Sequence, residues 1–349
     1  MFMCILLNMN NKVAFIFDLF FIISAHIGIG FVTGKEIEQF FLSGSNIFVT
    51  ILSFFCIFVL TCSFILFVKN KYNISNIHSL NQLAFGKYHT LFNIVLITQF
   101  LISCSAMLAG CDNIMLNIFN ITIPIFSLCL SVITFFILCG GVGRIKLVSN
   151  FLLPILMIGI ITNITYNYSP PTIAANINYK DILFPILFCC ENSLTLIAVL
   201  LKTKSKPRPL VMTSGIIISL VILFSLFVIV NFSADMPLLL ASKNLGVAFF
   251  IIYIIIIIFA LFITLQICAY NSLEIALKWT DKKYISILII LLVAQSLSRL
   301  GFTFIIKYLY TMLAVVSGVY LLILFIKFSK DFLKYNKLNN KNCEINTQK

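Results

Sequence analysis

The sequence predicts an all-α polytopic membrane protein with about ten transmembrane helices, built as two inverted repeats of five helices each. Three observations predict this class. Hydrophobic residues occupy 61% of the 349 positions and charged residues only 10%, whereas a soluble protein has about 25% charged residues. Apolar runs of about 20 residues recur, each long enough to cross the hydrocarbon core of a bilayer. The first and sixth runs carry glycine-rich or polar interruptions at matching positions.

Ten spans are predicted from the continuous apolar runs. In lipid every backbone polar group needs an internal partner, which leaves helices or a closed barrel, and a barrel would show short alternating segments instead. The spans are 13–43 (broken), 46–68, 91–111, 123–140, 146–167, 181–201 (broken), 210–231, 246–273, 284–298 and 302–327. The first repeat is therefore 13–167 and the second 181–327. They are flanked by an N-terminal segment (1–12), an external loop (168–180) and a basic tail (328–349).

The net charge of +13 indicates topology. With ten spans and the N-terminus inside, 19 of the 24 Lys and Arg residues fall on the inner side. The other five, on the outer side, are Lys35, Lys180, Lys243, Arg299 and Lys307. This asymmetry predicts a multi-pass protein of the cell membrane with both termini in the cytoplasm. No basic face with interleaved aromatic residues forms a domain, so nucleic acid is not an expected partner.

The two broken spans lie about 160 residues apart. Gly28, Gly30 and Gly34 interrupt the first, and each costs about 1 kcal/mol relative to Ala in a helix interior. Glu191 and the polar residues after it interrupt the sixth. An odd number of spans per half inverts the second half, and paired interruptions in inverted halves indicate a transporter binding site near the midplane. The alternative for the glycines is a small-residue packing face, since Gly30 and Gly34 form a GxxxG pair.

No constellation typical of an enzyme is present. The chain has three histidines and eleven scattered cysteines, without a C-x-x-C pair. A phosphate-binding loop of the G-x-x-x-x-G-K-[ST] type is also absent. We therefore expect neither catalysis nor a bound cofactor or metal, apart from Na⁺ or H⁺ as a coupling ion. The expected partners are a small-molecule substrate and the lipid bilayer.

The segment GIGFVTGKEIEQFF (28–41) resembles the first-helix signature of the YkvI-type bacterial membrane proteins. Asn192 and the Leu297, Ser298, Gly301 and Phe302 pattern resemble weaker features of that family, and the likeness runs from about 13 to 327. The family is similar to a distant branch of the amino acid–polyamine–organocation transporters. The resemblance implies the five-plus-five LeuT-type fold with helices 1 and 6 discontinuous, and secondary transport.

This chain departs from the family pattern at the expected site. Ile29 replaces a smaller residue, which narrows the space beside the first break, and His26 stands where a small or neutral residue is more frequent. Cys189, Cys190 and Glu191 replace aromatic or neutral residues. A ligand different from that of other members is therefore expected.

The substrate site is predicted at the two breaks and on the third span. Glu191 is the strongest candidate, because a carboxylate near the bilayer midplane is costly and usually faces a cavity or a partner. It can pair with a substrate ammonium or carry a coupling proton; the alternatives are a structural pair with His26 and a solvated vestibule. The predicted substrate-binding residues are Gly28, Ile29, Gly30, Phe31, Gly34, Gln99, Ser103, Cys190, Glu191, Asn192 and Ser193.

Ion or proton coupling is assigned to His26, Glu191 and Thr264. A structural hydrogen bond to an unwound carbonyl is the alternative for His26. The resemblance implies that Thr264 fills one position of a sodium site, although Na⁺ needs several oxygen ligands and one hydroxyl is evident. Glu36 is a candidate outer gate, or a carboxylate that favours a helix N-terminus. Asp18 is a candidate inner gate, or a partner for an inner cation.

Together these patterns predict a secondary transporter of a small organic solute, an amino acid or an amine, coupled to an ion or proton by alternating access. Two other functions remain open. One is a non-transporting ligand receptor on the same fold, like the membrane subunits of spore germinant receptors. The other is a passive channel, which would show flux without saturation, although two breaks facing each other favour an occluded site.

Overall fold

The structure is a computed structural model and describes residues 11–347 except 45, 170–175, 233 and 235. Within this part the side chains at 11, 29, 117 and 334–347 lie outside the description. Every regular element in the described residues is a helix. Seven helical stretches among them are long and apolar enough to cross a membrane, as the composition predicts.

The first predicted span is divided into α2 (Asn11–His26), α3 (Ile29–Thr33) and α4 (Lys35–Phe41). Long helices follow in the order α5 (Ile47–Tyr72), α7 (His89–Phe119), α9 (Val142–Asn167), α10 (Lys180–Leu200), α11 (Pro207–Ile229), α13 (Val247–Ala276) and α16 (Thr311–Thr347). Two shorter apolar helices are α8 (Ile125–Leu138) and α14 (Lys283–Ser298). The last long helix is preceded by α15 (Phe302–Phe304) and a π-helical turn, η3 (Ile305–Tyr310).

Each of the ten predicted spans coincides with one of these helical segments. Two short helices were not predicted: α6 (Ile77–Phe85), which η1 (Gly86–Tyr88) joins to α7, and α12 (Pro237–Ser242), which η2 (Lys243–Leu245) follows. Neither contains an apolar run long enough to attract attention as a span. The predicted tail 328–349 is largely a continuation of α16, and residues 1–10 of the predicted N-terminal segment lie outside the described residues.

The outer surface of the bundle is rich in large apolar side chains. Phe151 is 69% exposed, Ile158 66% and Ile326 73%. Exposed side chains of this size recur on α5, α8, α11 and α14 as well. A water-soluble protein rarely exposes such extended apolar surface, so this exterior matches a lipid environment.

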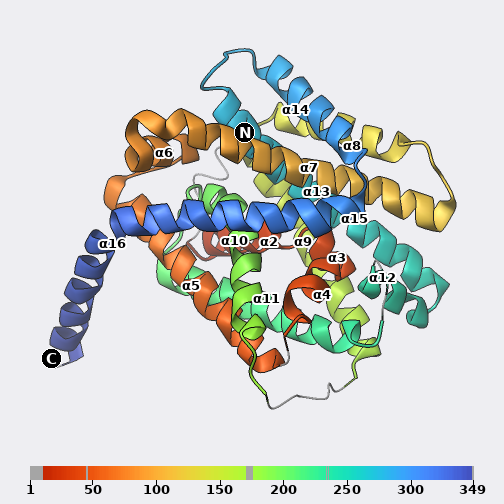
Figure 1. The fold of residues 1–349 in the computed structure, drawn as a ribbon, viewed down its shortest axis with the longest axis horizontal. Coiled ribbons are helices and arrows are strands. Elements are labelled where there is room, and N and C mark those ends of the chain that lie inside the picture. The colour runs from red at the N-terminus through yellow and green to blue at the C-terminus, as the bar shows by residue number, and fades with distance from the viewer. Residues whose placement is uncertain (1–10, 45, 170–175, 233, 235, 348–349) are drawn as a thin grey trace.

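The interior of the bundle is formed by α2, α7, α10 and α13. α7 packs against α13 and α14, while α10 packs against α5, α16 and α2. Figure 1 shows α16 crossing the front of the bundle, with α10 behind it and the short helices α3 and α4 towards the opposite end from α6. The middle of the molecule is therefore surrounded by helices from both halves of the sequence.

Two glycines, Gly28 and Gly34, interrupt the first predicted span. α2 closes with the hydrogen bond from Ile27 N to Ile23 O, 3.1 Å, after which Gly28 is extended at φ −91° and ψ −170°. Gly34 then adopts the left-handed region at φ 85° and ends α3, and its carbonyl accepts the first bond of α4 from Glu38 N at 2.9 Å. A non-glycine residue is strained at this φ, which explains the glycine at 34.

The sixth predicted span has no break. α10 runs continuously from Lys180 to Leu200, so the predicted discontinuity at 191–193 is wrong. The polar residues there keep the helix: Ser193 Oγ donates to Cys190 O at 2.6 Å and Asn192 Nδ2 donates to Phe188 O at 3.3 Å. No glycine occurs in α10, and its proline, Pro185, lies near the N-terminus. A polar side chain in a membrane helix needs a cavity or a partner, but it does not by itself unwind the backbone.

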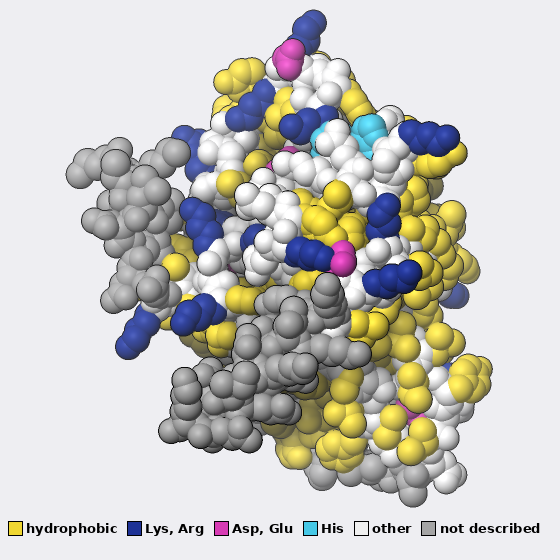
Figure 2. Space-filling model, turned by 90° about the vertical axis from the view of Figure 1, so that its left-hand side faces the viewer, with side chains coloured by type: hydrophobic (Ala, Val, Ile, Leu, Met, Phe, Trp, Pro, Cys, Tyr) yellow, Lys and Arg dark blue, Asp and Glu magenta, His cyan; other side chains and the backbone are white. Residues whose placement is uncertain are grey.

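Basic side chains gather at one end of the bundle. Figure 2 views the molecule from the side at which α6 and the end of α16 lie in Figure 1, and Lys and Arg side chains are spread across that face. We define this basic end by Lys69, Lys146, Lys202 and Lys204, which lie close together. All four were predicted on the inner side, and the structure places them together at one end of the bundle.

Replacing Gly34 by alanine is expected to destabilise the protein. The new Cβ would lie 2.9 Å from Ile229 Cδ1 and 3.0 Å from both Leu238 Cγ and Pro237 Cγ, and φ would remain strained. We expect a loss of about 1–3 kcal/mol, visible as a lower melting temperature in detergent. Gly246→Ala is the matched control, because Gly246 has φ 94° and open space around the added Cβ. Equal shifts in melting temperature for the two variants would show that packing around Gly34 contributes nothing to stability.

Candidate functional site

A small cavity lies in the interior of the bundle, where α2, Gly28, α4, α7, α10, α13 and η3 meet. Its volume is about 20 Å³, room for roughly one water molecule. An organic solute therefore fits only after the surrounding helices move apart. The lining residues are Ala25, Gly28, Glu36, Ser103, Met107, Glu191, Asn192, Thr195, Thr264, Cys268 and Tyr310.

A larger cavity of about 490 Å³ lies between α9 and α11. Its lining is almost entirely hydrocarbon, and Ile161, Leu220 and Phe224 of this lining are each more than 40% exposed. It is a groove on the apolar exterior of the bundle. It lacks the converging polar groups of a solute site, so the small central cavity is the better candidate.

The central cavity depends on the break in the first segment. At Gly30 an added Cβ would overlap the side chain of Glu36, which folds back over α3 into that space. Glu36 is 3% exposed and lines the cavity. The glycine therefore allows a carboxylate from α4 to reach the centre of the bundle. Glu36 was predicted as an outer gate or a helix-terminal carboxylate; it stands in the first turn of α4, and its side chain lines the cavity.

Helix α13 supplies partners for carbonyl groups at the break. The Thr264 hydroxyl lies 3.4 Å from the Ile27 carbonyl and 3.1 Å from that of Ala260. The Tyr253 hydroxyl donates to the carbonyl of Val32 at 3.0 Å. Unpaired backbone groups are costly in a membrane interior, so these two side chains stabilise the interrupted helix.

Helix α10 contributes Glu191, Asn192 and Thr195 to the cavity. Glu191 is 5% exposed, and its Oε2 has no hydrogen-bond partner among the described residues. Its backbone carbonyl accepts a bond from Gln99 Nε2 at 2.9 Å, and Gln99 Oε1 accepts one from Ser317 Oγ at 2.8 Å. Gln99 thus ties α7, α10 and α16 together beside the cavity without lining it.

The structure brings together six of the predicted site residues: Gly28, Glu36, Ser103, Glu191, Asn192 and Thr264. The other predicted substrate residues lie nearby but outside the lining. Phe31 and Ser193 are fully buried, Cys190 packs near Gly318, and the side chain of Ile29 lies outside the described part. Gly30 and Gly34 shape the backbone around the cavity.

His26 does not line the cavity, although it was predicted to couple ions or protons there. Its ring makes an edge contact with Phe58 of α5, at 5.1 Å between centroids, and has no side-chain hydrogen-bond partner. The neighbouring residue Ala25 faces the cavity instead. The predicted pair between His26 and Glu191 is not present.

Five lining residues were not predicted as site residues: Ala25, Met107, Thr195, Cys268 and Tyr310. Thr195 follows Glu191 by one helical turn, so its position on the same face was available from the sequence. Cys268 follows Thr264 by the same interval. Tyr310 ends the π-helical turn η3, and π-helical turns frequently occur at functional sites.

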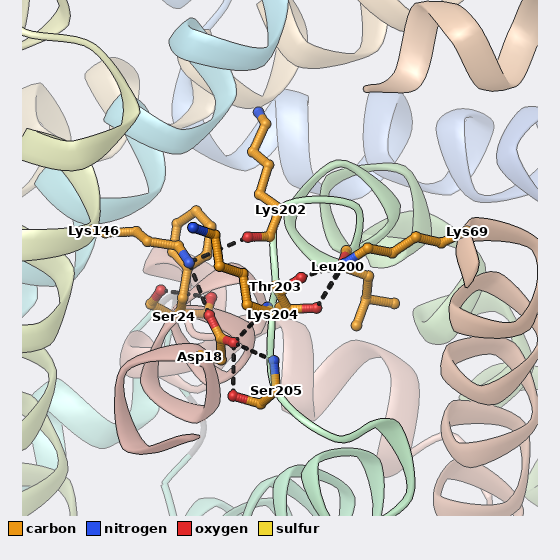
Figure 3. A network of polar contacts seen from close by, with 10 residues as sticks. Asp18, Ser24, Lys69, Lys146, Leu200, Lys202, Thr203, Lys204 and Ser205 are labelled. Atoms are coloured by element: carbon orange, nitrogen blue, oxygen red, sulfur yellow. Dashed lines mark hydrogen bonds and ion pairs between the residues drawn. The ribbon is translucent and has the colours of Figure 1, made fainter. Parts of the chain in front are cut away.

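Asp18 lies at the basic end, in the network shown in Figure 3. It is 3% exposed, and its Oδ1 accepts an ion-pair hydrogen bond from Lys146 Nζ at 2.8 Å. Its Oδ2 accepts from Lys204 N at 2.7 Å, Ser205 N at 2.9 Å and Ser205 Oγ at 2.8 Å. Asp18 therefore pairs with a cation, Lys146, that was predicted on the inner side, and it ties α2 to α9 and to the loop after α10.

Two further lysines hold the same loop. Lys69 Nζ donates to the carbonyls of Leu200, at 3.0 Å, and Thr203. Lys202 Nζ forms an ion pair with Glu274 Oε2 at 2.8 Å and donates to Asn271 Oδ1 at 3.0 Å. The segment 200–205 is therefore fastened to α2, α5, α9 and α13 at the basic end.

Asp181 occupies a comparable position at the opposite end. It is fully buried at the start of α10. Its Oδ1 accepts from Asn46 N at 2.9 Å and Thr50 Oγ1 at 3.1 Å, and its Oδ2 accepts from Asn178 N at 2.7 Å. Asp181 thus ties the start of α10 to the loop before α5. It was not predicted, although it follows Asp18 by 163 positions, close to the repeat offset.

Comparison with protein-family models and with curated proteins finds no match for this chain.

Proposed function

We propose that this chain is a secondary transporter that moves a small organic solute, an amino acid or an amine, by alternating access coupled to H⁺ or Na⁺. The observation that carries the proposal is the small interior cavity, which is lined by both halves of the chain and contains the buried carboxyl groups of Glu36 and Glu191. Buried carboxylates at this depth are costly and usually serve transport. The fastening of segment 200–205 at the basic end is consistent with a carrier that opens to one side at a time.

The packing pattern supports an inverted five-plus-five repeat. In the order of the ten spans, the counterparts are α2 and α10, α5 and α11, α7 and α13, α8 and α14, and α9 and α16. Exchanging each helix for its counterpart turns the α2–α11 contact into the α10–α5 contact. The same exchange turns α2–α9 into α10–α16, and α8–α13 into α14–α7. All of these contacts are present. Midplane sites between such repeats are characteristic of secondary transporters.

The short helices and the two aspartates follow the same exchange. α6 lies between the second and third spans of the first half, and α12 between those of the second half. Asp18 binds the loop before α11, while Asp181 binds the loop before α5. The repeat supports a LeuT-type fold, as the resemblance to the YkvI-type family implies. On this proposal the basic end faces the cytoplasm and the protein lies in the cell membrane.

The candidate coupling groups are Glu191 for a proton and Thr264 for sodium. A carboxylate oxygen without a partner, such as Glu191 Oε2, can carry a proton between the two sides. A sodium ion at the break would take oxygen ligands from the Thr264 hydroxyl and the Ile27 carbonyl, which already lie 3.4 Å apart. Whether uptake depends on a proton gradient or on a sodium gradient distinguishes the two coupling ions.

Uptake in proteoliposomes tests the proposal. We expect saturable accumulation of an amino acid or amine, driven by an imposed proton or sodium gradient and absent from protein-free liposomes. Glu191→Gln should abolish coupled accumulation, whereas Glu38→Gln should not, because Glu38 pairs with Lys35 at 3.0 Å and does not line the cavity. Binding without flux would identify a receptor, and flux without saturation a channel.

A further inference from the structure

Another cavity lies at the basic end, between the end of α13, the start of α14 and the turn that precedes α9. Its volume is about 300 Å³, the space of roughly ten water molecules in the liquid. Lys202 of the basic end reaches it, since Lys202 Nζ lies 4.4 Å from the centroid of the Tyr270 ring. We call this cavity the basic-end pocket, and its lining residues are Asn76, Gly141, Tyr270, Leu273, Glu274, Leu277, Lys278 and Lys283.

The lining of the basic-end pocket carries an excess of positive charge. The carboxylate of Glu274 is already paired with Lys202 Nζ at 2.8 Å. Neither Lys278 nor Lys283 forms an ion pair with a described residue. Lys283 Nζ donates to the carbonyl of Cys139 at 2.9 Å, and an ammonium has three N–H donors. Two ammonium groups are therefore available to an anion in this pocket.

Backbone and amide donors lie beside the two lysines. Gly141 precedes the first turn of α9 as its N-cap residue. The first N–H groups of a helix have no partner within it, and the positive end of the helix dipole attracts anions. The side-chain oxygen of Asn76 accepts a hydrogen bond from Ser79 N at 2.8 Å, so its amide N–H₂ group is the part that can donate to a ligand. This combination of donors suits a phosphate group.

An apolar groove begins close to the basic-end pocket and follows the seam between α8 and α14, which lie side by side in Figure 1. The two helices are antiparallel, because Lys283 reaches Cys139 whereas Gln295 donates to Ser127 at 2.8 Å. The volume of the groove is about 310 Å³. We call it the α8–α14 groove, and its lining residues are Leu128, Ser131, Val132, Phe135, Phe136, Leu288, Leu291, Leu292 and Gln295.

The length of the α8–α14 groove matches one leaflet of a bilayer. Along α14 the groove begins at Leu288, about 7.5 Å beyond Lys283, and ends at Gln295, about 18 Å beyond it. One leaflet is about half of the hydrocarbon thickness, or roughly 15 Å. A headgroup held by Lys283 would therefore place an acyl chain of the same molecule in the groove.

We propose that the basic-end pocket and the α8–α14 groove together bind one anionic phospholipid. Its phosphate lies between Lys278 and Lys283, and one acyl chain lies between α8 and α14. Trp279 and Tyr284, next to these lysines, are 50% and 64% exposed, as expected of aromatic residues at a membrane–water interface. Basic pockets between transmembrane helices bind anionic headgroups. The inference requires a membrane protein and does not depend on transport.

Trp279 is a natural reporter of lipid binding, because it is the only tryptophan of the chain and follows Lys278 directly. Bromine atoms on an acyl chain quench tryptophan fluorescence at short range. In phosphatidylcholine vesicles, brominated phosphatidylglycerol should quench Trp279 at an about 30-fold lower mole fraction than brominated phosphatidylcholine. We expect this ratio because each lysine contributes about fivefold to the affinity for an anionic lipid. Unbrominated phosphatidylglycerol should reverse the quenching, and equal quenching by the two brominated lipids would overturn the proposal.

Variants distinguish a built site from a general attraction of the basic end for anionic lipids. Lys278→Gln and Lys283→Gln should each reduce the preference for phosphatidylglycerol by about fivefold. Lys282→Gln is the matched control, because Lys282 is exposed, lies in the same turn and is outside the lining. An equal loss in the Lys282 variant would contradict the assignment. Lys278 is exposed, so its variant should keep the wild-type melting temperature and decides the result even if the Lys283 variant does not fold.

Soluble anions distinguish a phospholipid from free phosphate. Inorganic phosphate and glycerol 3-phosphate carry the same anionic group without acyl chains. If the α8–α14 groove contributes to binding, neither should displace brominated phosphatidylglycerol at a concentration at which unbrominated phosphatidylglycerol does. Displacement by phosphate at equal concentration would reduce the pocket to an anion site and overturn the assignment of the groove. None of these outcomes depends on uptake, so failure of the lipid site and failure of the transport proposal are measured separately.

Discussion

Replacing Asp18 by alanine is expected to open the basic end of the bundle and expose the central cavity to that side. Asp18 accepts four hydrogen bonds, one of them from the ammonium of Lys146. Removing one partner of a buried ion pair costs about 3–5 kcal/mol, because the other charge loses its partner. If the variant loses this free energy only in the conformation that is closed at the basic end, the population open to that end rises by more than about 100-fold.

Cys268 is a natural reporter for this opening. It lines the cavity and is 1% exposed. A charged, membrane-impermeant thiol reagent should modify it in the Asp18→Ala variant from the basic end only, in vesicles of known orientation, with the site identified by peptide mass spectrometry. Cys104, fully buried outside the cavity lining, should stay unmodified if the protein remains folded.

Asp331→Asn is the matched control at the same end. Asp331 forms an ion pair with Lys71 at 2.7 Å, and both side chains are about 40% exposed. Exposed pairs of this kind are worth about 0–1 kcal/mol, so labelling of Cys268 should stay at the wild-type level. Unchanged labelling in the Asp18 variant would show that the network does not hold the basic end closed.

The sequence was a good guide to the membrane-crossing helices because their signal is long and continuous. Apolar runs such as that in α13 identify a helix whatever surrounds it. The break in the first segment was also predictable, since Gly34 takes a φ that disfavours other residues. α6 and α12 escaped prediction because they have only 9 and 6 residues, too few for an apolar run that crosses a bilayer.

The break predicted in α10 failed for a physical reason. Glu191 was interpreted as a sign that the backbone unwinds. The backbone is helical there, and the Glu191 side chain lines a cavity between helices. The polar residue therefore marked a position that lines the candidate cavity, whereas the break inferred from it is wrong. Glycine or proline, which act on the backbone itself, would have been the proper signal.

Side-chain direction next to the break was not predictable either. His26 and Ala25 are adjacent, and the chain leaves helical geometry at Gly28, so no helical period fixes which of them faces the centre. Ala25 does, and His26 packs on Phe58. Met107 and Tyr310 carry no distinguishing pattern among nine methionines and twelve tyrosines, and their place in the site depends on how distant helices pack.

Asp181→Ala is expected to expose the cavity at the end opposite the basic one. This result is the sharper test of the inverted repeat. Asp181 accepts hydrogen bonds from the backbone of Asn46 and Asn178 and from the hydroxyl of Thr50. Each bond to a charged group is worth about 1.5–3 kcal/mol, so the variant loses several kcal/mol of support at the end opposite the lysines. Because Asp181 holds the loop before α5 as Asp18 holds the loop before α11, the two losses should act on opposite ends.

The thiol reagent should therefore modify Cys268 of the Asp181 variant from the end opposite the basic one. Asp112→Asn is the control, since Asp112 lies towards the end of α7 and accepts a hydrogen bond from Ser127 Oγ, 2.9 Å, which stays within the first half of the chain. Labelling from the same side in both the Asp18 and Asp181 variants would contradict the inverted arrangement, even if transport were observed. Labelling from opposite sides requires two gates around one cavity, which a passive channel does not need and a carrier does.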